Sequence, residues 1–328
     1  MAPIAETREI TPTPTPPPHG GGGCWESARD QTRPTPVARG AQQPVDPSVS
    51  AFAAELVRPF GHTARAVIFY GSCLREAQLD GLMLDFYVIV SDYAQAYRAA
   101  GKAGWLARAN ALIPPNVFPA AFDGLAAKYA VLSEADLARA CSMQARDVSV
   151  WARFAQPVRL VWCADAAARE AALSALCDAP VTLLRHAAPL TDAATADPLA
   201  AWRTGFTRTY GAELRAERGD RPDKVVDFAP DHYAKVGEAI AREHPDIAAM
   251  PRSDAEARWA ALRTRGKRLT VARLAKASFT FADGIDYLAW KINRHAGTQI
   301  TIQPWQRKWP LVAAVFLVPK LLRSGAVK

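Results

Sequence analysis

Glycine, serine and aspartate stand at a spacing suited to phosphate chemistry in the first third of the chain. Gly71 and Ser72 end one apolar run, and Asp85 follows after twelve residues, near the start of a second apolar run. A Gly-Ser turn can present backbone amides to a phosphate group. A strand carboxylate can hold the Mg²⁺ that neutralises phosphate charge. A common turn followed by an edge aspartate explains the same pattern equally well without any chemistry.

Strands and helices must position these residues. The apolar runs are rich in β-branched and aromatic residues, which predicts buried strands. Strands are predicted at 65–70, 84–90, 128–133 and 157–164. Helical spacing predicts helices over 50–60 and over 133–154. This mixture predicts an α+β domain.

Composition divides the chain into four parts. Residues 1–47 contain ten of the 25 prolines and a glycine run, which predicts a disordered tail. Residues 48–190 form the predicted α+β domain. Residues 191–304 are rich in alanine, leucine and arginine without strand patterns, which predicts a helical domain. Residues 305–328 are apolar in the middle and basic at both ends, which predicts an amphipathic tail suited to a membrane surface.

Charge and cysteine content argue against several functional classes. The net charge is +8, and residues 251–328 contain 15 of the 40 Lys and Arg but only 4 of the 32 Asp and Glu. The five cysteines form no CxxC pair, so neither a zinc site nor a disulfide framework is expected. No apolar stretch reaches the ~18 residues of a spanning helix. An apolar segment beside the basic residues favours a bilayer over nucleic acid as partner, so we expect a cytoplasmic protein that is peripheral on the anionic inner face of the cell membrane.

The Gly-Ser turn and Asp85 together resemble the site of polymerase-β-type nucleotidyltransferases. In that superfamily the turn opens a helix that binds a triphosphate, and the strand carboxylate ligates Mg²⁺. Most members have Asp-x-Asp, whereas Tyr87 occupies the second position here. The resemblance implies a polymerase-β-type nucleotidyltransferase domain, followed by the helical domain and the amphipathic C-terminal tail.

One family of that superfamily usually has a single Asp followed by apolar residues. It is the mitochondrial-type phosphatidate cytidylyltransferase family, also called the translocator assembly and maintenance proteins, together with its bacterial relatives. Segment FYGSCLREAQLDGLMLDFYVIVSD resembles this family, and the resemblance covers roughly residues 50–220. It continues at PPNVF, AAKYAVLSEADL and WARFAQPVRLVW, and more weakly at TYGAELRAE. Cys73 and Ala130 stand where the family usually has glycine.

The resemblance implies roles for several residues. Gly71 and Ser72 would bind the phosphates of CTP, Asp85 would bind Mg²⁺, and Lys128 would neutralise phosphate charge. Asn116, Arg208 and Tyr210 would contact substrate, the last two toward a lipid phosphate. A turn residue at Asn116, a solvated lysine at Lys128 and a salt-bridged helix face over 206–218, which includes Glu213 and Glu217, remain the alternatives.

The expected function is CDP-diacylglycerol synthesis in phospholipid biosynthesis. CMP would pass from CTP to phosphatidic acid, with release of pyrophosphate. The alternatives are transfer to another acceptor, or a degenerate membrane-associated protein that binds nucleotide or lipid without catalysis. The missing second carboxylate favours the degenerate protein. The sequence leaves the base preference, the oligomeric state and the further metal ligands open, and Asp80, Asp92 and Asp123 are candidates by location only.

Overall fold

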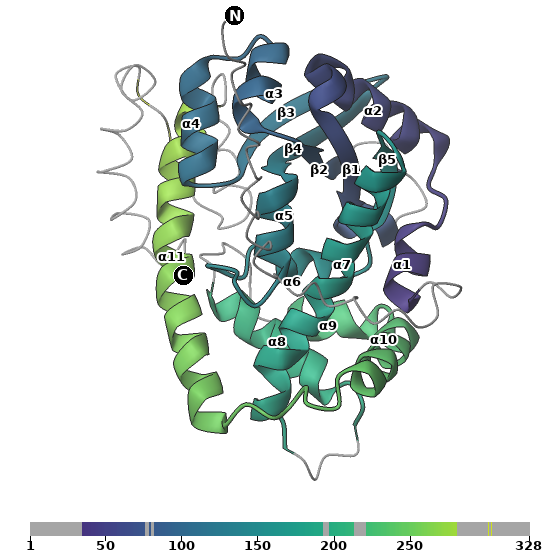
Figure 1. Cartoon of the computed structure of the whole chain (residues 1–328), viewed down its shortest axis with the longest axis vertical. Coiled ribbons are helices and arrows are strands. Elements are labelled where there is room, and N and C mark those ends of the chain that lie inside the picture. The colour runs from purple at the N-terminus through teal and green to yellow at the C-terminus, as the bar shows by residue number, and fades with distance from the viewer. Residues whose placement is uncertain are drawn as a thin grey trace, which may run out of the picture. The chain divides into compact units, whose positions relative to one another are not determined.

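The strands form one mixed five-stranded sheet, which lies in the upper half of the view in Figure 1. The computed structural model describes residues 35–75, 79, 82–192, 197–212, 221–280, 301 and 303. The strand order is β3-β4-β2-β1-β5, in which β2 and β4 are parallel and the other neighbours are antiparallel. The strands are β1 (Ala64–Tyr70), β2 (Met83–Val90), β3 (Asn116–Phe122), β4 (Leu125–Ser133) and β5 (Arg159–Cys163). The four predicted strands are confirmed, and the fold is mixed α and β.

Strand β3 was not predicted from the sequence. Its residues, NVFPAAF, include two alanines and a proline, so its β-propensity is weak. Proline is tolerated in a strand at the edge of a sheet, where one side needs no ladder hydrogen bond. β3 is such an edge strand and pairs with β4 through a tight turn at Asp123 and Gly124.

Helices cover both faces of the sheet (Figure 1). Phe86 and Val88 of β2 belong to the core cluster on one face, and Tyr87 and Ile89 belong to the cluster on the other. The first cluster includes residues of α2 (Pro47–Val57), α3 (Tyr93–Ala99) and α4 (Gly104–Leu112). The second includes residues of α5 (Glu134–Cys141), α6 (Trp151–Phe154) and α7 (Ala166–Ala187). Each strand therefore presents alternate residues to two different helix layers.

The predicted helix over 133–154 is wrong in its middle. Helix α5 ends at Cys141, and α6 begins at Trp151. In the loop between them, the Asp147 carboxylate accepts a hydrogen bond from the Ser149 backbone N–H at 2.7 Å. Short polar side chains compete for backbone groups in this way, and the local turn replaces the helix. The sequence analysis also missed α7, whose 22 residues are capped by Asp165.

The predicted N-terminal tail ends earlier than residue 47. Helix α1 (Pro36–Ala41) begins with a proline in its first turn and is capped by Thr35, whose hydroxyl accepts from the Ala38 N–H at 3.1 Å. Ala38 and Ala41 are buried. Disorder is therefore wrong for 36–41, because a proline at a helix start is compatible with packing. Residues 1–34 lie outside the described part of the chain.

Helices follow in the C-terminal third, as predicted. They are α8 (Ala200–Ala212), α9 (Arg221–Asp227), α10 (Pro230–Glu243) and α11 (Arg252–Thr280). Three short 3₁₀ turns occur earlier in the chain, η1 (Arg58–Thr63) and η2 (Ser72–Arg75) on either side of β1 and η3 (Ala188–Leu190) after α7. Buried residues of α8 to α11 belong to the same core cluster as Ile68 and Tyr87 of the sheet. The domain boundary at residue 190 stays a prediction. None of the described helices is long and apolar enough to cross a membrane, and the tail over 305–328 lies outside the described residues.

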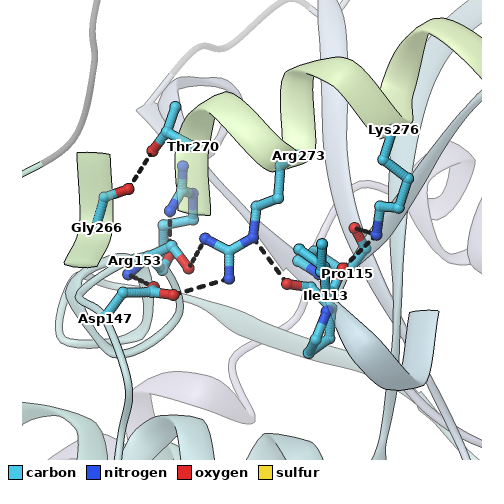
Figure 2. Close-up of polar contacts among 10 residues, drawn as sticks. Ile113, Pro115, Asp147, Arg153, Gly266, Thr270, Arg273 and Lys276 are labelled. Carbon is cyan, nitrogen blue, oxygen red and sulfur yellow. Dashed lines mark hydrogen bonds and ion pairs between the residues drawn. The ribbon is translucent and has the colours of Figure 1, made fainter. Parts of the chain in front are cut away.

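Helix α11 is tied to the sheet by two basic side chains (Figure 2). Arg273 donates to the Pro114 carbonyl at 2.8 Å, to Ser149 Oγ at 3.1 Å and to Asp147 Oδ2 at 2.8 Å. Lys276 donates to the carbonyls of Ile113 and Pro115. These contacts hold α11 against both the start of β3 and the loop before α6.

Candidate active site

Three polar side chains on three neighbouring strands form a row across the sheet. Tyr70 of β1 pairs in register with Asp85 of β2, and Asp85 pairs with Lys128 of β4. Each of the three is two residues from a member of the same core cluster, namely Ile68, Tyr87 and Ala130, so they share one face of the sheet. The row lies where β1 ends and β2 begins, directly beside the Gly71-Ser72 turn.

Asp85 and Lys128 form an ion pair within this row. Lys128 Nζ lies 3.0 Å from Asp85 Oδ1. The Lys128 side chain is 31% exposed and the Asp85 side chain is 17% exposed. Asp85 Oδ1 accepts no hydrogen bond from the described residues and has the ammonium as its neighbour. Partial burial lowers the local dielectric and strengthens the attraction relative to a surface pair. A phosphate or a metal ion binding here must therefore compete for one partner of this pair.

The Gly71-Ser72 turn packs directly against the carboxylate. Gly71 has φ +96°, and a Cβ added to it would lie 2.9 Å from Asp85 Oδ2. Ser72 is exposed and begins η2, a single 3₁₀ turn. The family pattern implies a helix after this turn, and the described residues show only η2, while 76–78 and 80–81 lie outside the description. The Gly71-Ser72 turn therefore lies beside the Asp85 carboxylate, where β1 ends.

Gly71→Ala is expected to impair nucleotide binding at this site and to cause only a moderate loss of thermal stability. A positive φ costs alanine about 1–2 kcal/mol, and the new methyl group would also displace Asp85 Oδ2. Gly124→Ala is the matched control, because Gly124 has φ +75° and nothing within 4 Å of an added Cβ. Thermal unfolding should show a loss for both variants, the larger one for Gly71→Ala, and a nucleotide-binding assay should show a loss for Gly71→Ala alone. Equal binding by both variants contradicts the steric argument.

Tyr70 and Arg153 are site residues that the sequence analysis did not single out. Arg153 of α6 is close enough to Tyr70 to affect the pKa of its hydroxyl. Burial raises the pKa of Tyr70 well above its usual value, the nearby Asp85 charge raises it further, and Arg153 opposes the rise. The hydroxyl therefore stays protonated near neutral pH. The tyrosine directly before Gly-Ser and the WARF segment were the available signals.

Tyr87 fills the position where the superfamily usually has its second carboxylate. Tyr87 is buried in the core cluster that lies on the same face of β2 as Asp85. Its ring lies 5.2 Å from the Tyr70 ring and 5.0 Å from the Phe154 ring, between centroids. The Tyr87 side chain therefore packs against Tyr70 of the row, and it supplies no carboxylate for a metal ion.

The three residues predicted to contact substrate are not members of this row. Asn116 is fully buried at the start of β3, and its amide donates to the Tyr97 hydroxyl at 2.8 Å and the Leu106 carbonyl at 2.9 Å. Arg208 forms a two-point ion pair with Glu256 of α11, at 2.8 and 2.7 Å. Tyr210 is half-buried on the same helix, α8. Asn116 and Arg208 therefore have structural partners, and Glu213 and Glu217 lie outside the described residues.

Two of the three candidate further metal ligands, Asp92 and Asp123, are not brought to Asp85. Asp92 caps α3 by accepting from the Gln95 N–H at 2.9 Å, and Asp123 lies in the β3–β4 turn with φ 48°. Asp80 is outside the description. Among the described residues, no group of three or more His, Cys, Asp or Glu side chains could hold a metal ion. Mg²⁺ needs only one or two protein carboxylates when substrate phosphates complete its shell, so Asp85 fits Mg²⁺ only together with a nucleotide.

Comparisons with known proteins give little further information. No protein-family model matches the chain, and no curated protein matches it significantly. One solved structure that resembles it is a nucleotidyltransferase-like protein from Exiguobacterium sibiricum 255-15, with 12% identity and a TM-score of 0.25. That match covers 84% of this chain and 92% of the other. A similarity this weak establishes neither a shared fold nor an activity.

Proposed function

We propose that the protein is a nucleotidyltransferase whose site is the Gly71-Ser72 turn with Asp85 and Lys128. The observation that supports this most is the close packing of the turn on a partly buried carboxylate that also has a lysine partner. Backbone amides, a cation and a metal-binding carboxylate are the three groups that a nucleoside triphosphate requires.

The site residues would act mainly by positioning and charge stabilisation. A bound Mg²⁺ would neutralise charge on the triphosphate, and Asp85 would hold it. Lys128 would turn from the carboxylate to a phosphate oxygen, because a metal ion at Asp85 repels the ammonium and the triphosphate attracts it. The amides at Ser72 would orient the phosphates beside it. No covalent protein intermediate is required.

We further propose CTP as donor and phosphatidic acid as acceptor, giving CDP-diacylglycerol. The supporting observations are the family resemblance over roughly residues 50–220 and the apolar, basic segment 305–328. Five basic residues in that segment, each worth ~1 kcal/mol near an anionic surface, would hold the protein on the inner face of the membrane.

The experiment is a transfer assay with the full chain, Mg²⁺ and radiolabelled CTP, ATP, GTP or UTP. Vesicles containing phosphatidic acid supply the acceptor, and vesicles of phosphatidylcholine alone are the control. We expect a lipid-soluble labelled product with CTP and phosphatidic acid. Transfer to a soluble acceptor only would retain the nucleotidyltransferase and reject the lipid substrate. Absence of both nucleotide binding and transfer would reject the proposed function.

A degenerate, non-catalytic nucleotide-binding protein is the second candidate. The specific observation in its favour is that Tyr87 replaces the second carboxylate while Lys128 neutralises the first. Such a protein would bind CTP equally well with Mg²⁺ or with a chelator and would show no transfer. The labelled transfer assay therefore separates the two candidates.

Lys128→Ala is expected to weaken CTP binding by about 1.5–3 kcal/mol, because a charge-assisted hydrogen bond to phosphate is lost. Isothermal titration with CTP and Mg²⁺ measures this change. Lys235→Ala is the control, since Lys235 is an exposed lysine on α10. Unchanged CTP affinity in Lys128→Ala would make Lys128 a structural partner of Asp85 only.

A further inference from the structure

We propose that one face of helix α4 docks on an anionic lipid bilayer. This face, the α4 face, contains Trp105, Arg108 and Leu112. The proposed transfer reaction does not use it, and it is separate in the sequence from the basic segment 305–328. The inference therefore goes beyond the proposed function, and its test needs no nucleotide.

The α4 face presents large apolar side chains to solvent. Trp105 is 48% exposed and Leu112 is 74% exposed, and among the residues that the structure describes only Phe228 is a further large hydrophobic residue with such exposure. Trp105, Arg108 and Leu112 stand at positions i, i+3 and i+7, so they lie on one stripe of the helix. A single exposed apolar side chain needs no explanation, whereas apolar side chains gathered on one stripe indicate a contact surface.

The opposite side of α4 packs on the sheet without these large side chains. Ala107 and Asn110 are buried there, and Leu106 is partly buried. The Asn110 amide donates to the Val131 carbonyl of β4 at 2.9 Å, and its side-chain oxygen accepts from the Asn116 backbone N–H. A helix of a globular protein ordinarily turns its largest apolar side chains to the core. An exposed tryptophan and leucine beside an arginine suit a helix that lies in a membrane interface instead.

The charge around the α4 face is suited to an anionic surface. Residues 93–122, which include α3, α4 and β3, contain Arg98, Lys102 and Arg108 but no Asp or Glu. α3 and α4 pack against each other at the upper end of the view in Figure 1. Arg98 and Arg108 are exposed, and Lys102 Nζ lies 4.1 Å from the centroid of the Phe118 ring. Basic side chains attract anionic lipid, and tryptophan suits the headgroup level.

Charge also favours a bilayer over a second copy of this chain as the partner. Two copies joined through their α4 faces would bring two basic surfaces together, which like-charge repulsion disfavours. Phe228 has the opposite surroundings, since it follows Asp227 and precedes Asp231. These carboxylates would repel anionic lipid, so Phe228 is a matched control at 51% exposure.

The first test is co-sedimentation of the full chain with vesicles of phosphatidylcholine and phosphatidylglycerol in equal parts. We expect Leu112→Gln to lower the partition coefficient about tenfold and Arg108→Gln about fivefold. High salt should diminish the effect of Arg108→Gln and preserve that of Leu112→Gln. Phe228→Gln should bind as the unmodified protein does, and thermal unfolding shows that each variant is folded. No vesicle binding by the unmodified protein, or equal binding by Leu112→Gln, overturns the proposal.

The second test reports on Trp105 itself through quenching of tryptophan fluorescence by brominated phosphatidylcholine in the same vesicles. Trp105→Phe keeps an apolar ring, so we expect it to bind the vesicles nearly as well as the unmodified protein. The quenched part of the fluorescence should be smaller in this variant, because the quencher acts on tryptophans that reach the acyl chains. Unchanged quenching overturns the proposal. A lipid-free dimer that Leu112→Gln dissociates also overturns it and assigns the α4 face to a second copy.

Discussion

Asp85→Asn is expected to reduce nucleotidyl transfer by about 100- to 1000-fold while the protein stays folded. The amide keeps the shape of the carboxylate but loses the charge that would hold Mg²⁺, and loss of such electrostatic stabilisation typically costs two to three orders of magnitude. The change in the free energy of unfolding should stay within about 1 kcal/mol, because Lys128 is 31% exposed and regains water contacts. Single-turnover rates and thermal unfolding measure the two effects.

Asp92→Asn is the matched control for this experiment. Asp92 follows the other end of β2 and caps α3, and asparagine caps helices as well as aspartate does. We therefore expect near-normal activity and stability in this variant. Comparable activity in Asp85→Asn and Asp92→Asn would reject the assignment of Asp85 to the metal and would favour the non-catalytic candidate.

Arg273→Ala is expected to destabilise the protein by about 3 kcal/mol. The substitution removes hydrogen bonds to Pro114, Ser149 and Asp147, and it leaves the Asp147 carboxylate, only 8% exposed, without its cation. Removing one partner of a buried ion pair typically costs about 3–5 kcal/mol, and the partial exposure of Arg273 places this case at the low end. Urea unfolding followed by circular dichroism measures the loss.

Lys276 should not compensate for that loss. Burial, with a smaller contribution from the Arg273 charge, lowers the pKa of Lys276 to about 7. Near neutral pH a large part of this lysine is uncharged, whereas an arginine stays protonated throughout. Arg265→Ala is the control, since Arg265 is exposed on the same helix and alanine is a good helix former. A similar loss of stability in both variants would show that helix propensity, and not the contacts of Arg273, explains the effect.

Local sequence patterns predicted the elements whose amino-acid composition matches their burial in the structure. β1, β2, β4 and β5 are short apolar runs. Asp85 and Tyr87 are two residues apart, and this spacing places both on one face of β2. The Gly71-Ser72 turn follows from glycine's tolerance of positive φ. Prediction failed where the composition of a segment did not match its surroundings in the folded protein. The examples are the edge strand β3, which contains a proline, and helix α1, which lies in a proline-rich region.

Contacts between distant segments could not be read from the sequence. Asn116 was predicted as a substrate contact, and only the packing of α3 and α4 against β3 shows that its amide is used inside the core. Arg208 likewise has Glu256 as its partner, 48 positions later in the chain. Side chains of this kind have the same sequence pattern whether they bind substrate or stabilise the fold, because burial depends on residues far away in the chain.

The Gly-Ser turn, the strand carboxylate and the strands that contain or precede them could be predicted from the sequence alone, because they depend on backbone preference and on a period of two residues. The row of Tyr70, Asp85 and Lys128 could not, since it requires the register of three strands, two of them parallel and separated by a long connection. Folding also brings Arg153 near Tyr70 and Arg273 to the loop before α6. The physical reason is that hydrogen bonding and ion pairing act over a few ångströms in space, and the chain folds residues more than a hundred positions apart to within that distance.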